Sequence, residues 1–429
     1  MTHFRIAVCF AALLGPAAVA RAQTPPRLSL SDAEQRALAG HPSVRAAQSA
    51  AQVAQQSVRE VRSAYWPTIF GSVTGAAAPD GTRIAAGALN NPSILDRFAT
   101  GVTATQLVTD FGRTRDLVQT QTLRASAQEQ DAVLIRAQVR LDVDRAYFET
   151  LRAQAVLRVA QQTVAARQLV VDQVGALASS GLKSGLDLSF ARVNLSQARL
   201  LLVQAEGDVQ AAFAALNAAM GSAQQATFEL VEEPISVLAA DDAAALIAVA
   251  LRDRPDVVAE RFADQAASRF VDAERALSRP TMAAVGVAGV TPYRDTTLND
   301  HYSAAGFNVT VPLLNGGLYS ARRAEASYRA QIADDALRDL ENRVARDVTI
   351  AWLRSMTARQ RMDLTNELLA QASDALELAQ SRYNLGLSSI VELTQAQLNE
   401  TEAEIGQAAA RYDYQLRGAE LRFQTGALK

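Results

Sequence analysis

Two stretches of the chain repeat one pattern: GLKSGLDLSFARVNLSQA at residues 181–198 and GLSSIVELTQAQLNETEA at residues 386–403. Each begins with Gly-Leu, and a Ser-x-x-acid pattern follows. A glycine after a long helix can adopt the left-handed C-cap conformation, and Ser-x-x-acid is a capping box that starts a new helix. Gly181 and Gly386 are therefore predicted to turn two equivalent hairpins, each made of two long antiparallel helices.

The two corners belong to a tandem duplication that covers most of the chain. They lie 386 − 181 = 205 residues apart, and the same offset joins Asp142 to Asp347. Earlier landmarks are offset by slightly more, which indicates that one loop is longer in the first copy. We expect two repeats, at residues 23–221 and 222–429, that together form one structural unit.

Residues 1–22 have the features of a secretory signal peptide. Arg5 precedes an apolar run, and the small-residue pattern Ala-Arg-Ala at residues 20–22 is typical of a cleavage site. A membrane anchor is the alternative, but the apolar run is too short to span a bilayer. Cleavage would remove Cys9, the only cysteine, so the mature chain is expected to have neither a disulfide nor a lipid anchor on that residue.

The composition favours long, closely packed helices: 49% of the residues are hydrophobic but only 6% are aromatic. No glycine occurs between Gly112 and Gly175, or between Gly317 and Gly386, and these segments also lack proline. Two uninterrupted helices are therefore predicted. Apolar residues recur every seven positions in two seams, so each helix can pack neighbours on both sides and form a wall. An extended coiled-coil rod is the alternative.

Four further segments alternate apolar with polar residues, as strands of a membrane barrel do, although hairpins of a soluble protein share this alternation. Four strands cannot close a barrel in lipid, where open edges are not tolerated, so several chains would have to share one. The loop at residues 79–91 is then expected outside the cell. The segments lie at residues 66–77, 97–108, 281–290 and 302–313.

These residues resemble the TolC-like family of outer-membrane efflux proteins. The resemblance rests on the order and duplication of weak motifs: LSLSDAEQRALAGHPSV, LVTDFGR, PLLNGGL and RYNLGLSSIVEL. It implies a mainly α fold with membrane β structure, in which a homotrimer forms a helical barrel and a shared transmembrane barrel of about twelve strands. The implied function is an exit duct in the outer membrane of a Gram-negative bacterium, reaching into the periplasm. Its implied partners are a periplasmic adaptor and an inner-membrane transporter, in tripartite efflux or type I secretion.

The same resemblance implies a gate at the hairpin tips. Asp187 and Tyr383 match a pair that ties neighbouring helices together, and Glu392 matches an acid at the constriction. This chain departs from the family pattern at two positions: Ser388 stands where other members have an arginine, and Gln395 stands where a second acid occurs. Either the closed state is held less firmly as a result, or Lys183, the equivalent residue of the first copy, compensates for the missing arginine. Helix capping alone is the alternative role of the two acids.

Other classes of protein fit the sequence less well. A periplasmic adaptor also has a long helical hairpin, but here the hairpin occurs twice and helix continues almost to Lys429. The chain has only three histidines, with no metal-ligand spacing, nucleophile elbow or phosphate-binding loop, so no enzyme, metal or cofactor is expected. The net charge of −3 argues against binding to nucleic acid. The exported cargo is not encoded in any motif.

Overall fold

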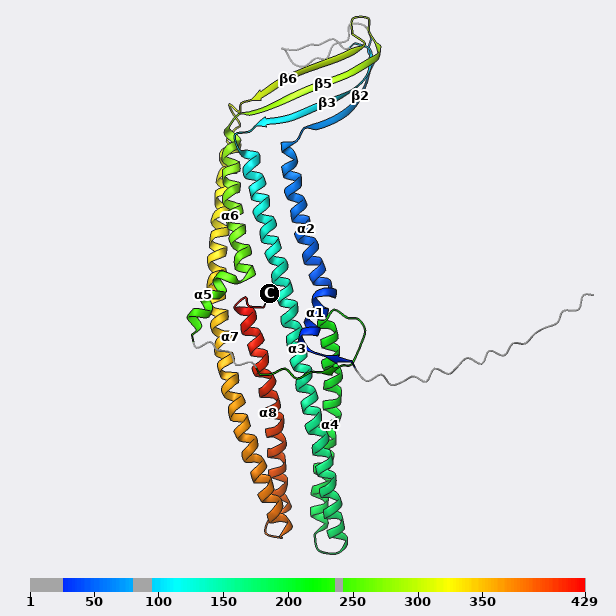
Figure 1. Ribbon diagram of the computed structural model, residues 1–429, viewed down its shortest axis with the longest axis vertical. Helices are drawn as coiled ribbons and strands as arrows, with labels where there is room; N and C mark the ends of the chain where they lie inside the picture. Colours follow the sequence, from blue (N-terminus) through cyan, green and yellow to red (C-terminus); the bar gives the residue numbers. More distant parts are fainter. Residues whose placement is uncertain (1–25, 80–94, 236–241, 429) are drawn as a thin grey trace, which may run out of the picture.

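The computed structural model describes residues 26–79, 95–235 and 242–428 and shows an elongated molecule (Figure 1). A sheet lies at one end, and two helical hairpins point away from it at the other. The predicted signal peptide at residues 1–22 and nearly all of the loop at residues 79–91 lie outside the described part of the chain.

The duplication is visible in the lengths of the helices. In the first copy, α1 (Leu30–Gly40) has 11 residues and α2 (Pro42–Arg62) has 21, and in the second copy α5 (Ala243–Asp253) and α6 (Pro255–Arg275) have the same lengths. Proline stands at the start of both longer helices, where its missing N–H is not needed. Short 3₁₀ turns, Ser63–Tyr65 and Ala276–Ser278, end both helices.

The predicted long helices are confirmed. α3 (Arg113–Ser179) and α7 (Leu318–Asn384) each have 67 residues, and each returns through a 35-residue helix, α4 (Gly185–Ala219) or α8 (Ile390–Gln424). At 1.5 Å per residue, the longer helices span about 100 Å. The predicted heptad seam on α3 is buried at Leu141, Phe148 and Ala155. We call α3 with α4 hairpin one, and α7 with α8 hairpin two.

The four predicted strands form one antiparallel sheet in the order β2-β3-β5-β6. The second pair differs from the predicted ranges, because β5 runs on to Arg294 and β6 stops at Thr310, two residues before Pro312, which has no N–H to donate. The observed bounds are Thr68–Ala76 (β2), Arg97–Thr109 (β3), Thr281–Arg294 (β5) and His301–Thr310 (β6).

The strand register gives the sheet one apolar and one mostly polar face, because directly paired residues point the same way. Val102 pairs with Gly71 and with Ala288, and Ala288 pairs with Ser303, so these positions share a face. The large side chains of that face are exposed in the chain: Ile69, Val73, Val102, Phe307 and Val309. The opposite face is richer in hydroxyls but also carries the exposed Phe70 and two valines of β5: Thr68, Phe70, Thr103, Thr105, Val285, Val287, Asn308 and Thr310.

Midway along the helices, a two-stranded parallel sheet of β1 (Arg27–Leu28) and β4 (Glu229–Leu230) binds the start of the chain to the link between the copies. The fully buried Tyr147 of α3 donates its hydroxyl to the carbonyl oxygens of Leu28 at 2.9 Å and Val231 at 2.6 Å. This region holds an extended apolar core, which fixes the two copies against each other. Among the described helices, none is long and apolar enough to cross a membrane.

Candidate functional site: the two hairpin tips

The two predicted corners are confirmed as turns with the same backbone. Gly181 has a φ of 75° and Gly386 a φ of 74°, both in the left-handed region. A Cβ atom at either position would meet nothing within 4 Å, so the glycines are required by conformation and not by space. Both tips point away from the sheet (Figure 1).

The first corner has the complete predicted capping box. Ser184 accepts a hydrogen bond from the backbone N–H of Asp187 at 3.1 Å, and the Asp187 carboxylate accepts from the N–H of Ser184 at 3.2 Å. Asp187 is half-buried at the start of α4. Its carboxylate therefore has a structural role at the helix start.

The second corner has only half of the predicted box, and here the sequence prediction was wrong. Ser389 accepts from the N–H of Glu392 at 3.4 Å, but the Glu392 carboxylate does not reach back to Ser389. It lies 3.3 Å from the guanidinium of Arg382, in the last turn of α7. The longer side chain of glutamate and a cation one turn before the glycine explain the difference. Both side chains are nearly half exposed, so this ion pair is weak.

Tyr383 joins the two hairpins. Its side chain is 5% exposed and packs with Val174 of hairpin one and with Ile390 and Leu393 of hairpin two. The ammonium of Lys183, from hairpin one, lies 4.0 Å from the centre of the tyrosine ring, which is a close cation–π contact. Lys183 thus contacts Tyr383 across the two hairpins.

The Tyr383 hydroxyl makes no hydrogen bond to any described residue. The implied bond to Asp187 is therefore not formed within this single chain, although burial and then the Asp187 carboxylate both raise the pKa of Tyr383. Ser388 is similar, because its hydroxyl oxygen is buried and has no hydrogen-bond partner among the described residues. Gln395 is exposed on α8 and donates to Asn399 at 2.9 Å.

Sequence reasoning missed the contacts that join the hairpins above the tips. Asn194 of α4 donates to Thr394 of α8 at 2.9 Å, and the buried Arg167 of α3 donates to the carbonyl oxygen of Gln397 at 2.9 Å. Asn194 shows a signal in the duplicated pattern, since Asn399 stands at the equivalent position. Arg167 gives no local signal, because its partner is 230 residues away.

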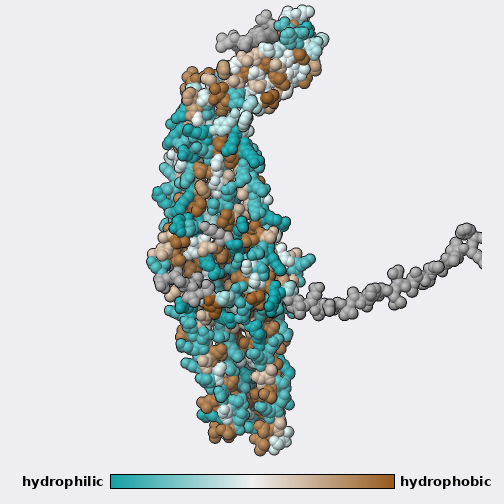
Figure 2. Space-filling model, viewed as in Figure 1, coloured by the Kyte–Doolittle hydropathy of each residue, from teal (hydrophilic) through white to brown (hydrophobic). Residues whose placement is uncertain are grey.

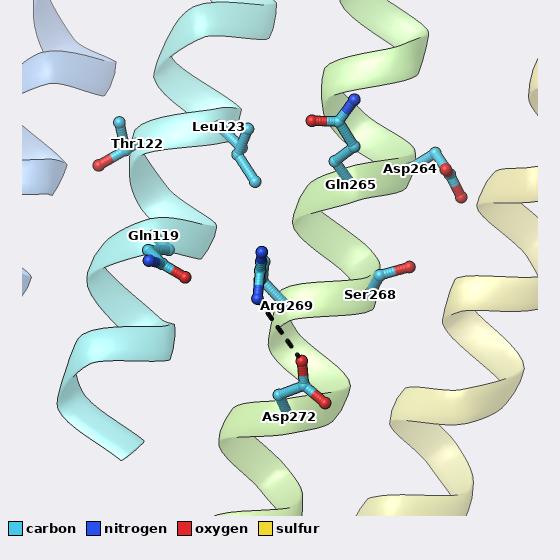
Figure 3. Close-up of a pocket in the computed structure, with 8 residues that line it drawn as sticks. All are labelled: Gln119, Thr122, Leu123, Asp264, Gln265, Ser268, Arg269 and Asp272. Atoms are coloured by element: carbon cyan, nitrogen blue, oxygen red, sulfur yellow. Dashed lines mark ion pairs between the residues drawn. The ribbon is translucent and has the colours of Figure 1, made fainter. Parts of the chain in front are cut away.

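A separate cavity of about 550 Å³ lies between α3 and α6, in the half of the molecule nearer the sheet (Figure 3). Arg269 projects into the space between the helices, and its guanidinium lies 4.0 Å from the carboxylate of Asp272 on the same helix. Seven of its eight lining residues are of polar types, and none belongs to the tips. Its distance from the tips excludes it from the candidate gate.

The duplicated helical hairpins, the shorter helices α2 and α6 beside them and the four-stranded sheet with an apolar face define a TolC-like fold. The chain belongs to the outer membrane efflux protein family, whose model matches residues 33–222 and 246–427. This is a family of transport proteins of the Gram-negative outer membrane that reach into the periplasm.

Individual relatives agree with this assignment. The chain is 25% identical to the outer membrane protein OprJ of Pseudomonas aeruginosa over 315 residues, which cover 72% of this chain and 65% of OprJ. The match thus spans slightly less than two thirds of that relative's length.

Solved structures share the fold at lower identity. The outer membrane protein VceC of Vibrio cholerae superposes with a TM-score of 0.78 at 20% identity, over 92% of this chain and 96% of VceC. The open state of the Neisseria gonorrhoeae MtrE outer membrane channel superposes with a TM-score of 0.79 at 19% identity, over 92% of this chain and 88% of MtrE.

Proposed function

We propose that this chain is the outer-membrane exit duct of a tripartite efflux or type I secretion system, through which an inner-membrane pump exports its substrates passively. The observation that carries the proposal is the combination of an apolar-faced sheet with helices of about 100 Å at one end of it. Such a molecule can place the sheet in the lipid of the outer membrane and extend its helices across the periplasm. Family membership supports this arrangement.

A homotrimer is the assembly that fits the sheet. The edge strands β2 and β6 each have one unpaired side, and unpaired backbone groups are costly in hydrocarbon. Pairing β2 of one chain with β6 of the next would satisfy both edges and close a barrel of about twelve strands from three copies. The exposed Ile69, Val73 and Phe307 would then face lipid, and the threonine-rich face would line the pore.

The partners follow from the position of the tips. Helices that end in the periplasm need a connection to the pump, so a periplasmic adaptor and an inner-membrane transporter are the proposed partners at that end. An adaptor identity for this chain itself is disfavoured, because the hairpin is duplicated and the sheet has an apolar face.

The tips form the proposed gate of this duct. The contact of Lys183 with Tyr383 holds hairpin one against hairpin two, and Asp187 lies close enough to raise the pKa of that tyrosine. The proposed latch therefore consists of Lys183, Tyr383 and Asp187. Glu392 and Gln395 are exposed on α8, and three copies of Glu392 around one axis would favour cations in the pore.

Planar-bilayer recordings test both the duct and its gate. The purified protein should have the native mass of a trimer, and the double variant Asp187→Ala, Tyr383→Phe should raise the single-channel conductance at least twofold. Arg199→Met is a matched control, because Arg199 is exposed and bonds only within hairpin one, to Gln168. A conducting monomer would overturn the assembly, and an unchanged conductance in folded trimers would leave Asp187 with capping alone.

A further inference from the structure

Arg167 is a charged side chain inside the contact between the two hairpins. It lies on α3 of hairpin one and is only 6% exposed. Its guanidinium donates to the carbonyl oxygen of Gln397 at 2.9 Å and to the hydroxyl oxygen of Thr401 at 3.4 Å, both on α8 of hairpin two. A buried arginine bound across two helices is costly to unpair, because the buried guanidinium would then lose its hydrogen-bond acceptors.

The surroundings of Arg167 match a positive charge. Burial lowers the pKa of the guanidinium, while Glu400 and Glu404 of α8 act in the opposite direction. Thr401 also donates to the carbonyl oxygen of Gln397 at 3.0 Å, so this one oxygen receives two side-chain donors. The arginine is therefore held by a site on α8 that is built from polar groups at successive turns.

A second polar contact lies about one helical turn nearer the tips, since Thr394 precedes Gln397 by three residues on α8. Asn194 of α4 donates to Thr394 of α8 at 2.9 Å, and a cavity of about 90 Å³ separates this bond from Arg167. Arg167 is 14 residues before Gly181, which corresponds to about 20 Å of helix. The two contacts thus join the hairpins well above the tips.

The internal repeat shows that this charge belongs to one copy only. The position equivalent to Arg167 in the second copy is 167 + 205 = 372, where α7 has the buried Ala372. Among the described residues, α7 does not pack against α4 as α3 packs against α8. The arginine is therefore particular to the contact between α3 and α8.

We propose that Arg167 is a positioning residue that fixes the upper end of the moving part of the gate. Opening separates the hairpin tips below Arg167 and the Asn194–Thr394 bond, while the helical wall at and above these two contacts stays closed. This inference rests on the proposed gate, and it adds a limit to how much of each hairpin moves.

Disulfide trapping tests the proposal, because Cys9 is the only native cysteine and lies in the predicted signal peptide. Lys183→Ala breaks the latch and should raise the conductance at least twofold. In that background, Asn194→Cys with Thr394→Cys should form a disulfide on oxidation, and the conductance should stay within about 20% of the reduced value. The double variant Lys183→Cys, Tyr383→Cys places a cysteine pair at the tips, and its conductance should be raised in the reduced form. Oxidation of this pair should return the conductance to the wild-type level.

Arg167→Met makes the test specific to the arginine. When it is added to Lys183→Ala, separation should extend upward, so that oxidising the Asn194→Cys, Thr394→Cys pair now lowers the conductance at least twofold. Arg167→Lys keeps the charge, so its conductance should remain insensitive to oxidation of the same cysteine pair. This variant can be measured even if the methionine variant fails to assemble. Arg199→Met should have no such effect.

Two results would overturn the inference, and they are distinguishable. If Lys183→Ala raises the conductance but the upper disulfide returns it to the wild-type level with Arg167 intact, the hairpins separate at Arg167 and only the inference fails. If neither Lys183→Ala nor the Asp187→Ala, Tyr383→Phe variant changes the conductance of folded trimers, the proposed gate fails and the inference with it.

Discussion

The two copies of the repeat have nearly the same backbone but use different side chains at equivalent positions. Their long helices have the same number of residues, and their corner glycines differ in φ by only 1° (75° against 74°). Yet Asp187 caps its own helix, whereas Glu392 pairs with Arg382. The duplication therefore preserves backbone conformation and packing, and function can differ between copies through single side chains.

The largest difference to test is a buried acid present in one copy only. Asp144 of α3 is fully buried, whereas the equivalent residue, 144 + 205 = 349, is a threonine that bonds within its own helix. Burial and the neighbouring Glu34 of α1 raise the pKa of Asp144 to about 8, against the opposing charges of Arg422 and Arg140. No described N–H or O–H group donates to its carboxyl oxygens. The protonated form is therefore the one that the fold favours.

The raised pKa of Asp144 makes the free energy of unfolding depend on pH. The folded pKa of about 8 is above the ordinary value of 3.8, so the folded chain binds more protons between these values. The free energy of unfolding should fall as the pH rises from about 4 to about 8. Asp144→Asn should remove this slope and raise the free energy of unfolding at the upper pH by as much as about 6 kcal/mol, since one pKa unit corresponds to about 1.4 kcal/mol. Thermal unfolding followed by circular dichroism measures the change.

The control for this prediction lies on the same helix. Asp142 is about half exposed and pairs with Arg145, so Asp142→Asn should leave the slope as it is in the wild-type protein. An Asp144→Asn protein with an unchanged slope would show that another group causes the pH dependence.

The second prediction compares the two corner acids. Asp187→Ala removes half of a complete capping box and should lower the free energy of unfolding by about 1 kcal/mol. Glu392→Ala removes an exposed ion pair and should cost only about 0.3 kcal/mol. Equal losses in the two variants, measured from their melting temperatures, would mean that the corners are equivalent after all.

The third prediction concerns salt and has the smallest expected effect. The Arg382–Glu392 pair is exposed and should be screened at about 1 M salt, whereas the hydrogen bonds of the Asp187 box should not be. The stability difference between wild type and Glu392→Gln should therefore fall from about 0.3 kcal/mol to near zero, while Asp187→Asn keeps its difference. Titrations of melting temperature against salt concentration measure both.

Much of the fold was predictable because it depends on local rules. The absence of glycine and proline predicts the long helices, the corner glycines predict their turns, and the alternation around Phe307 predicts a strand. The contacts of the candidate gate were less predictable. Glu392 was predicted to cap its helix, since spacing alone does not say that Arg382 competes for the carboxylate.

Contacts between distant segments could not be predicted from one sequence. The bond of Arg167 to Gln397 depends on how α3 packs against α8, which heptad spacing predicts only as the presence of a neighbour and not as its identity. The burial of Asp144 depends in the same way on α1 and α8. Both residues appear in the sequence as ordinary charges on a long helix.

The open edges of the sheet also have a consequence for biogenesis. A newly translocated chain exposes the free sides of β2 and β6 together with Ile69, Val73 and Phe307. Such edges add strands from any chain they meet, so productive association competes with aggregation. We expect yield to fall at high expression levels and to depend on holdase chaperones that cover β structure in the periplasm, more than on oxidative folding catalysts, because the one cysteine, Cys9, lies in the predicted signal peptide.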